Sequence, residues 1–197
     1  MHYSFFALIS RMRYITRWSL MRNSTVENVQ EHSHMVAVIA HALAIISRDI
    51  LGHTADPDRT AAAALFHDAS EIFTGDLPTP IKYFDTDIMS AYKKVESVAA
   101  RKLLTSLPAD MRPAYDLLLD SGDGSGIMPL VKAADKLAAY IKCLEELKSG
   151  NLEFRPAAEQ SRKKLESLGM PEVDYFIEHF IPAFELTLDE LDLSIDK

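Results

Sequence analysis

The chain has 197 residues, of which 48% are hydrophobic and 25% are charged, and its formal net charge is −8. This length fits one domain, and a domain of this size buries roughly 70% of its unfolded surface without needing a disulfide or a structural metal. A protein with a negative net charge repels the phosphates of a nucleic acid, so we expect no nucleic-acid polymer as a partner. A local basic pocket for a single phosphate is still compatible with this charge.

The sequence carries no signal for export or for a membrane. Cys143 is the single cysteine, so the chain forms no internal disulfide, which fits a reducing compartment. No run reaches the 18 or more apolar residues of a membrane span, and the apolar run Phe5 to Ile9 is too short for a signal-peptide core. We therefore expect a cytoplasmic protein without a membrane partner.

Apolar residues recur at helical spacing along most of the chain, which predicts an all-α fold. We expect one domain over residues 1–197, with a core at roughly 5–186 and a solvated acidic tail from Asp189. The segment Arg17 to Asn23 is expected to be a connecting loop and 120–126 a flexible link. Helices are predicted near residues 5–15, 24–46, 57–75, 88–103, 108–119, 129–149, 156–168 and 171–184.

Local signals predict where two of these helices begin and end. Ser24 stands three residues before Glu27, which is typical of a capping box at a helix start. Asp56 before Pro57 is a second start signal, and that helix should end by Gly75. The stretch that follows contains Pro78 and Pro80, and it is either a simple helix terminator or the stiff rim of a pocket.

The segment Leu65-Phe66-His67-Asp68-Ala69-Ser70-Glu71 places three polar groups close together. On a continuous helix, His67 and Glu71 are spaced i,i+4, and Asp68 and Glu71 are spaced i,i+3, so all three share one wall. A carboxylate taken out of water costs several kcal/mol unless a partner compensates it. A divalent cation compensates several such groups at once and accepts mixed nitrogen and oxygen ligands.

His32 and Asp135 lie among apolar residues on the predicted buried faces of two other helices. Each alone is more often a core residue that bonds a carbonyl or a neighbouring helix. Together with His67 and Asp68 they supply two imidazoles and two carboxylates from three helices, which is a complete set for one divalent transition metal.

The order His32, His67-Asp68, Asp135 resembles the four-ligand signature of the HD-domain metal-dependent phosphohydrolases. Longer segments are similar to the bacterial 5'-deoxynucleotidase branch of that family and spread over most of residues 5–186. These segments are Arg17-Trp18-Ser-Leu-Met-Arg-Asn, Glu27-Asn28-Val-Gln-Glu-His32-Ser, Phe66-His67-Asp68-Ala-Ser-Glu71, Gly75-Asp76-Leu-Pro-Thr79-Pro and Tyr140-Ile-Lys-Cys-Leu-Glu-Glu-Leu.

The resemblance implies an HD-domain helical bundle that holds one divalent ion from the cobalt, manganese, zinc or iron class, with cobalt favoured. Glu71 would act as a general acid or base on the attacking water or the leaving 5'-oxygen; the alternative is a carboxylate that orients His67. Arg17 would be both a catalytic residue and the clamp on the phosphate. Four histidines are left as structural or surface residues: His34, His41, His53 and His179.

The resemblance also implies a substrate pocket. Trp18 would give a flat wall that excludes a 2'-hydroxyl, and Asp76 and Thr79 would reach sugar hydroxyls. The full set expected to bind substrate is Arg17, Trp18, Asp68, Asp76, Leu77, Pro78, Thr79 and Asp135. The implied substrates are 2'-deoxyribonucleoside 5'-monophosphates, hydrolysed to deoxynucleoside and phosphate by a homodimeric enzyme. The alternatives are another HD activity, on nucleoside triphosphates or cyclic nucleotides, and a non-catalytic regulator that senses a nucleotide or a metal.

Overall fold

The computed structural model describes residues 2–82, 84–119 and 126–191. Within these ranges the chain is helical, and its one extended pairing is an isolated antiparallel bridge between Thr16 and Asn28. The predicted all-α fold is therefore confirmed. The α-helices are α1 (Phe5–Ile9), α2 (Val29–Ile45), α3 (Pro57–Leu65), α4 (Glu71–Thr74), α5 (Thr79–Lys82), α6 (Thr86–Thr105), α7 (Arg112–Leu119), α8 (Ile127–Lys148), α9 (Arg155–Glu166) and α10 (Pro171–His179).

Short turns of other helical types join or extend these helices. The first predicted helix tightens from α1 into the 3₁₀ turn Ser10–Tyr14, and α2 continues as the π turn Ile46–Ile50. The last helix ends at His179, and Pro182 lies in the following 3₁₀ turn Ile181–Glu185. Most of the predicted link at 120–126 lies outside the described residues, except Gly126, which precedes α8. The predicted acidic tail from Asp189 lies outside them from residue 192 onward.

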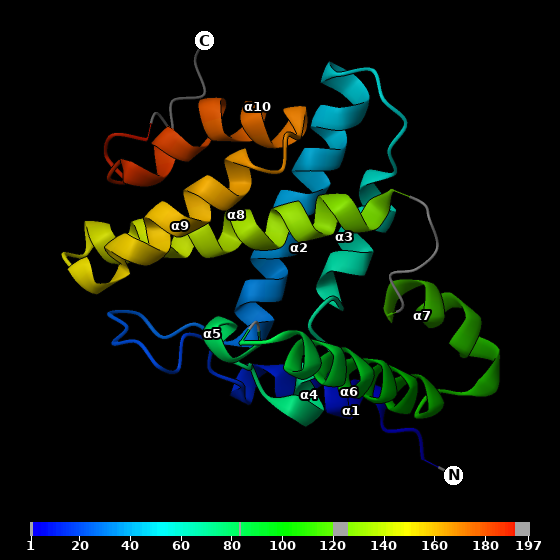
Figure 1. Ribbon diagram of the computed structural model, residues 1–197. Coiled ribbons are helices and arrows are strands. Elements are labelled where there is room, and N and C mark those ends of the chain that lie inside the picture. The colour runs from blue at the N-terminus through cyan, green and yellow to red at the C-terminus, as the bar shows by residue number, and fades with distance from the viewer. Residues whose placement is uncertain (1, 83, 120–125, 192–197) are drawn as a thin grey trace.

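Helix α2 runs through the middle of the molecule (Figure 1) and packs mainly against α3 and α8. Its predicted inward face is confirmed, because all six of its members are buried: Val29, His32, Val36, Ile39, Leu43 and Ile46. Helix α3 lies beside α2 and runs in the opposite direction, so the end of α3 lies next to the start of α2. Helix α8 crosses both of them.

The stretch Val29–Ile50, which comprises α2 and its π turn, reaches a mean hydropathy of 1.3 over an 18-residue window. By length and composition alone it is therefore apolar enough to cross a membrane, although its sequence contains no unbroken run of 18 apolar residues. Half of that window is buried inside the molecule. This burial is typical of a helix that forms the core of a globular protein.

The predicted capping box at Ser24 and Glu27 is wrong. Helix α2 begins later, at Val29, and its N-cap is Asn28, whose side chain accepts hydrogen bonds from Gln30 N and Glu31 N at 3.0 Å each. Glu31 closes the box by accepting from Asn28 N at 3.2 Å. Ser24 and Glu27 have other partners, described below, so neither is available to cap a helix.

The predicted continuous helix from Pro57 to Gly75 is also wrong. Helix α3 ends at Leu65, and the next residues form turns in which several amides bond a carbonyl three residues back, such as Ala69 N to Phe66 O at 3.0 Å and Glu71 N to Asp68 O at 3.0 Å. The helical i,i+4 spacing of His67 and Glu71 is therefore interrupted, whereas Asp68 lies near enough to Glu71 for its charge to act on that carboxyl.

A buried ion pair on α8 anchors the loop between residues 17 and 28. Glu146, which is 1% exposed, pairs with Lys142 and accepts hydrogen bonds from Ser24 N at 2.9 Å and from Ser24 Oγ at 2.6 Å. Lys142 Nζ donates to Thr25 O at 2.6 Å, and Asn151 Nδ2 donates to Glu146 at 2.8 Å. The loop is therefore fixed to the helix that carries Asp135.

This anchor predicts a large effect of Glu146→Ala on stability. We expect the free energy of unfolding to fall by about 3–5 kcal/mol, because the substitution leaves the buried ammonium of Lys142 without its carboxylate. Urea unfolding monitored by circular dichroism measures the change. The control is Glu145→Ala at the exposed neighbouring position, which we expect to change stability by no more than about 0.5 kcal/mol. Equal losses in the two variants would contradict the prediction.

The same group predicts a dependence of stability on pH. Burial acts to raise the pKa of Glu146, but hydrogen bonds from Lys142 and Ser24 outweigh it and hold the pKa well below its ordinary value of 4.5. Its contribution is fully present above pH 4.5 and is lost as the pH falls below that value. We therefore expect the stability difference between the wild type and Glu146→Gln to shrink steadily from pH 4.5 downward. A difference independent of pH would contradict this.

Candidate functional site

Three elements meet at one end of α2. His32 lies one turn into α2, His67 and Asp68 lie in the turns just after α3, and Asp135 lies in the middle of α8. The antiparallel packing of α2 and α3 brings the first two elements together, and α8 crosses both helices and packs against them (Figure 1). The residues that the sequence predicted as one cluster therefore come together.

The polar atoms of this cluster lie within a few ångströms of one another. His32 Nε2 is 3.1 Å from Asp135 Oδ1 and 3.7 Å from Asp68 Oδ2, and His67 Nε2 is 3.0 Å from Asp68 Oδ2. One ligand atom each from His32, His67 and Asp135 lies within 4.8 Å of the others. The side chain of His32 is fully buried, whereas that of Asp135 is 38% exposed. The cluster is thus closed at α2 and open to solvent at α8.

The ring of His67 is oriented by the backbone. Its Nδ1 lies 2.7 Å from Ala64 O, and because a carbonyl only accepts, Nδ1 carries the proton. Its Nε2 is buried and forms an ion pair with Asp68 Oδ2 at 3.0 Å. A backbone carbonyl that fixes one ring nitrogen and turns the other towards the ligand cluster is the usual arrangement of a metal-binding histidine. The donor set therefore fits a divalent ion.

Opposite charges set the protonation of this cluster. Burial acts to lower the pKa of His67, but the charges of Asp68 and Asp135 outweigh it and raise the pKa to about 9. Burial acts to raise the pKa of Asp68, yet His67, His32 and Arg17 hold it well below its ordinary value. The pKa of Asp135 is lowered for the same reason, chiefly by His32. Both aspartates are therefore charged at neutral pH.

Glu71 behaves in the opposite way. Burial, together with the charges of Asp68 and Asp76, raises the pKa of its carboxyl to about 9, so this group holds a proton at neutral pH. Its Oε2 is buried and has no hydrogen-bond partner among the described residues. The alternative that Glu71 orients His67 finds no support, because the carbonyl of Ala64 already holds that ring.

Arg17 and Trp18 lie in the loop before α2, next to the cluster. Arg17 Nη1 is 3.4 Å from Asp68 Oδ2, and Arg17 Nε donates to Glu27 Oε2 at 3.1 Å. Burial acts to lower the pKa of Arg17, but Asp68 and Glu27 raise it, so the guanidinium stays charged. The indole of Trp18 packs on Phe154 with ring centroids 5.3 Å apart.

The backbone of Trp18 is strained. Its φ is +57°, and within the described ranges no other residue except glycine has a positive φ. A residue held this way costs about 1–3 kcal/mol and persists only where its surroundings determine it. Here Trp18 O accepts hydrogen bonds from Met21 N at 2.9 Å and from Asn23 Nδ2 at 3.2 Å.

The segment after α4 reaches the cluster through Asp76. Gly75 ends α4 with φ +70°, a conformation that favours glycine, and turns the chain. Burial raises the pKa of Asp76, while Arg17 and the Trp18 amide oppose this rise, so its carboxylate lies near both. Leu77 and Pro78 are half-buried and lead into α5, a short helix that the sequence did not predict. The side chain of Thr79 lies outside the described part of the chain.

Sequence reasoning missed two groups near the site. Glu27 accepts from both Arg17 and Trp18, with Trp18 Nε1 at 3.3 Å, although its position three residues after Ser24 suggested a cap. Lys82 pairs with Glu96 at 3.0 Å, and its charge acts on Glu71. The sequence near Lys82 gave no signal for this placement.

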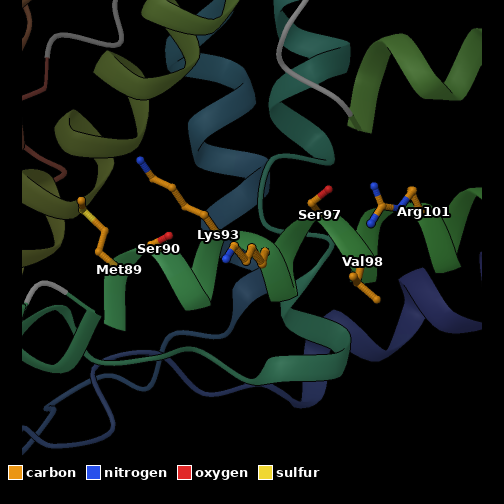
Figure 2. A pocket seen from close by; sticks show the side chains of 7 residues that line it. Met89, Ser90, Lys93, Ser97, Val98 and Arg101 are labelled. Carbon is orange, nitrogen blue, oxygen red and sulfur yellow. The ribbon is translucent and has the colours of Figure 1, made fainter. Parts of the chain in front are cut away.

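Open hollows also lie among the described residues away from the cluster. One, of about 530 Å³, lies along α6 (Figure 2) and is lined by Met89, Ser90, Lys93, Lys94, Ser97, Val98 and Arg101. Another, of about 510 Å³, lies near the start of α2. The α6 hollow is lined by residues of a single helix, so no polar groups from different elements converge in it, unlike in the His32 cluster.

A family model described as 5'-deoxynucleotidase YfbR-like matches residues 4–184. The chain belongs to this family. A 5'-deoxynucleotidase of Erwinia tasmaniensis is 49% identical over 191 residues, which cover 96% of each chain. The 5'-deoxynucleotidase yfbR of Photorhabdus temperata is 48% identical over 192 residues, which cover 97% of this chain and 98% of that one. The resemblance inferred from the motifs is confirmed.

A solved structure gives the same result for the fold. The HD-domain phosphohydrolase lin2634 of Listeria innocua aligns with a TM-score of 0.78 at 26% identity. The alignment covers 92% of this chain and 88% of that chain. The fold of this chain is therefore an HD-domain phosphohydrolase fold.

The geometry predicts that the cluster binds one divalent ion per chain. We expect cobalt titrated into metal-free protein to bind stoichiometrically, and we expect His32→Ala and Asp135→Ala to lose this binding, because each removes a ligand from the 4.8 Å cluster. Elemental analysis after dialysis measures metal content. His34→Ala, at an exposed position on the same helix, is the matched control. Full metal content in both cluster variants would exclude this site.

Proposed function

We propose that this chain is a divalent-metal-dependent 5'-deoxynucleotidase that hydrolyses 2'-deoxyribonucleoside 5'-monophosphates to deoxynucleoside and phosphate. The observation that carries the proposal is the convergence of His32, His67 and Asp135, with Asp68 beside them, in a chain of the YfbR-like family. A phosphoric monoester needs an activated water, a charge clamp on the phosphoryl oxygens and a proton for the leaving oxygen. The site supplies a candidate for each.

His32, His67, Asp68 and Asp135 are the proposed ligands of the ion. When bound, such an ion lowers the pKa of a bound water from 15.7 to about 7 and polarises the phosphoryl group. The placement of His67 Nε2 supports this assignment, because Ala64 O holds the other ring nitrogen and Nε2 faces the Asp68 carboxylate at 3.0 Å, where an ion would take the place of the proton. The opening at Asp135 gives the phosphate a route to the site and supports its role in binding substrate.

Arg17 is the proposed phosphate clamp. Its Nε is occupied by Glu27, so its terminal nitrogens are left to act on Asp68 and on phosphate oxygens. A guanidinium binds two oxygens at once and neutralises the charge that develops during transfer. Its charge is secured by the surrounding carboxylates, which raise its pKa against the opposing effect of burial.

Glu71 is the proposed general acid. Its carboxyl has a pKa of about 9 in the protein without an ion, so it holds a proton that it can donate to the leaving 5'-oxygen. The unpartnered Oε2 supports this role, because no described group competes for it. The charge of Asp68 acts on this carboxyl, so Glu71 lies beside the cluster.

We propose that Trp18 and the segment 76–79 form the part of the pocket that contacts the sugar of the substrate. The indole of Trp18 would close the space that a 2'-hydroxyl needs. Asp76 lies near Arg17 and Trp18, where its carboxylate can accept from a sugar hydroxyl. Leu77, Pro78 and Thr79 are proposed to line the same side.

The finer features of the enzyme are also proposals. We propose cobalt as the ion that supports activity best, with manganese, zinc and iron as competitors, because mixed nitrogen and oxygen ligands accept all four. We propose a homodimer in the cytoplasm, acting on free nucleotides and not on a nucleic-acid polymer or at a membrane. The net charge of −8 and the buried, unpaired Cys143 support a cytoplasmic enzyme that does not bind a polymer.

A substrate panel tests the activity. We expect cobalt-loaded protein to release phosphate from deoxynucleoside monophosphates and to act far more slowly on the ribonucleotides. Release of tripolyphosphate from triphosphates, or turnover of cyclic nucleotides, would instead indicate another HD activity. Binding of a nucleotide without turnover would indicate a regulator.

Glu71→Gln separates catalysis from metal binding. We expect kcat to fall by about 10²–10⁴-fold, because the amide cannot donate the proton that the carboxyl supplies. Metal content should stay at the wild-type value, since Glu71 is not among the ligands. The measurements are phosphate release and elemental analysis on the same samples. Wild-type turnover in this variant would remove Glu71 from the mechanism.

A further inference from the structure

One carboxylate oxygen holds both residues proposed to recognise the substrate. Glu27 Oε2 accepts from Arg17 Nε at 3.1 Å and from Trp18 Nε1 at 3.3 Å. An indole N–H only donates, and Nε is the guanidinium nitrogen nearest the chain, so one acceptor fixes the plane of both groups. The side chains of Arg17 and Glu27 are only 12% and 18% exposed, which shields these bonds from solvent.

The position of Glu27 is itself determined by the backbone. Arg17 N donates to Glu27 O at 3.0 Å, and Val29 N donates to Ile15 O at 2.9 Å, on either side of the bridge between Thr16 and Asn28. This short antiparallel pairing sets Glu27 directly beside Arg17. Because Asn28 caps the start of α2 and His32 follows one turn later, the pairing also fixes Arg17 relative to the cluster.

The Trp18 indole and the Arg17 guanidinium need a hydrogen-bond partner that fixes their orientation. Neighbouring side chains on an extended chain point to opposite sides, and the φ of +57° at Trp18 departs from this pattern. Phe154 supports one part of the Trp18 ring, with centroids 5.3 Å apart, but a ring contact does not fix the position of the N–H. Glu27 supplies that constraint.

We propose that Glu27 is a positioning residue that holds Arg17 on the phosphate and Trp18 against the sugar, and so sets the preference for a 2'-deoxy substrate. The inference rests on the proposed function and adds the source of its selectivity. Bonds to a carboxylate are roughly twice as strong as those to a neutral acceptor, so a negative charge at this position strengthens both contacts.

The test compares Glu27→Ala and Glu27→Gln with the control Glu31→Ala. Glu31 lies four residues further along, in the first turn of α2, is exposed, and accepts a hydrogen bond from Asn28 N and not from Arg17 or Trp18. The control therefore reports what the loss of a carboxylate at this helix start does to stability alone. Cobalt-loaded protein is assayed with dAMP and AMP, and kcat and KM are measured for both.

We expect Glu27→Ala to lower kcat/KM for dAMP by about 10²-fold, the usual scale of a small misplacement of reacting groups, and to lower it less for AMP. The ratio of dAMP to AMP activity should therefore fall. Glu27→Gln, which keeps an acceptor oxygen without the charge, should lie between Glu27→Ala and the wild type. Metal content should be unchanged in all variants, and Glu31→Ala should keep the wild-type ratio.

A second measurement does not depend on turnover. Trp18 is the single tryptophan of the chain, so the intrinsic fluorescence at its emission wavelength reports its surroundings. Release of Nε1 in Glu27→Ala should increase quenching by acrylamide relative to both the wild type and Glu31→Ala. Unchanged quenching, or increased quenching with an unchanged dAMP to AMP ratio, would overturn the proposal. Wild-type protein that hydrolyses neither nucleotide would refute the proposed function, and the quenching result would then still decide whether Glu27 holds Trp18.

Discussion

The structure depends on the way in which buried carboxylates share a small number of positive groups. Asp68 and Asp135 face two imidazoles and one guanidinium within 3.0 to 3.7 Å, and this attraction outweighs the cost of burial, so both stay charged. Glu71 has no such partner and keeps its proton. One site therefore contains carboxylates in two protonation states, which is the condition for binding a cation and donating a proton in the same place.

Carboxylates also hold the loop that carries Arg17 and Trp18 next to the site. Glu27 binds Arg17 and Trp18, and Glu146 binds the loop that carries them to α8. Each carboxylate is paired with donors whose positions are fixed by backbone contacts. The loop before α2 has almost no regular structure, but two carboxylates hold it: Glu27 bonds its beginning, at Arg17 and Trp18, and Glu146 bonds its later part, at Ser24. This explains how a residue with the strained backbone of Trp18 keeps a defined orientation.

Folding topology explains why the four polar residues meet. An antiparallel pair of helices places the end of one beside the start of the other, and a third helix that crosses them contributes from its middle. His32, His67 and Asp135 are far apart in sequence, but each occupies the position on its element that this crossing brings inward. The end of α3 at Leu65 matters because the turns that follow carry His67 and Asp68 into the cluster, with Glu71 close enough to feel the charge of Asp68.

The sequence by itself determined the all-α fold, most of the longer helices, the buried face of α2 and the candidate ligands that meet in the cluster, because apolar periodicity and local motif spacing are properties of short segments. It could not fix where α2 begins or where α3 ends. The hydroxyl of Ser24 and the carboxylate of Glu27 found partners far along the chain or across the loop, and those partners displaced the local capping box. The tautomer of His67, the proton on Glu71 and the shared hold of Glu27 on two side chains were likewise decided only by tertiary structure, since each depends on which distant groups burial brings within hydrogen-bonding distance or leaves without a partner.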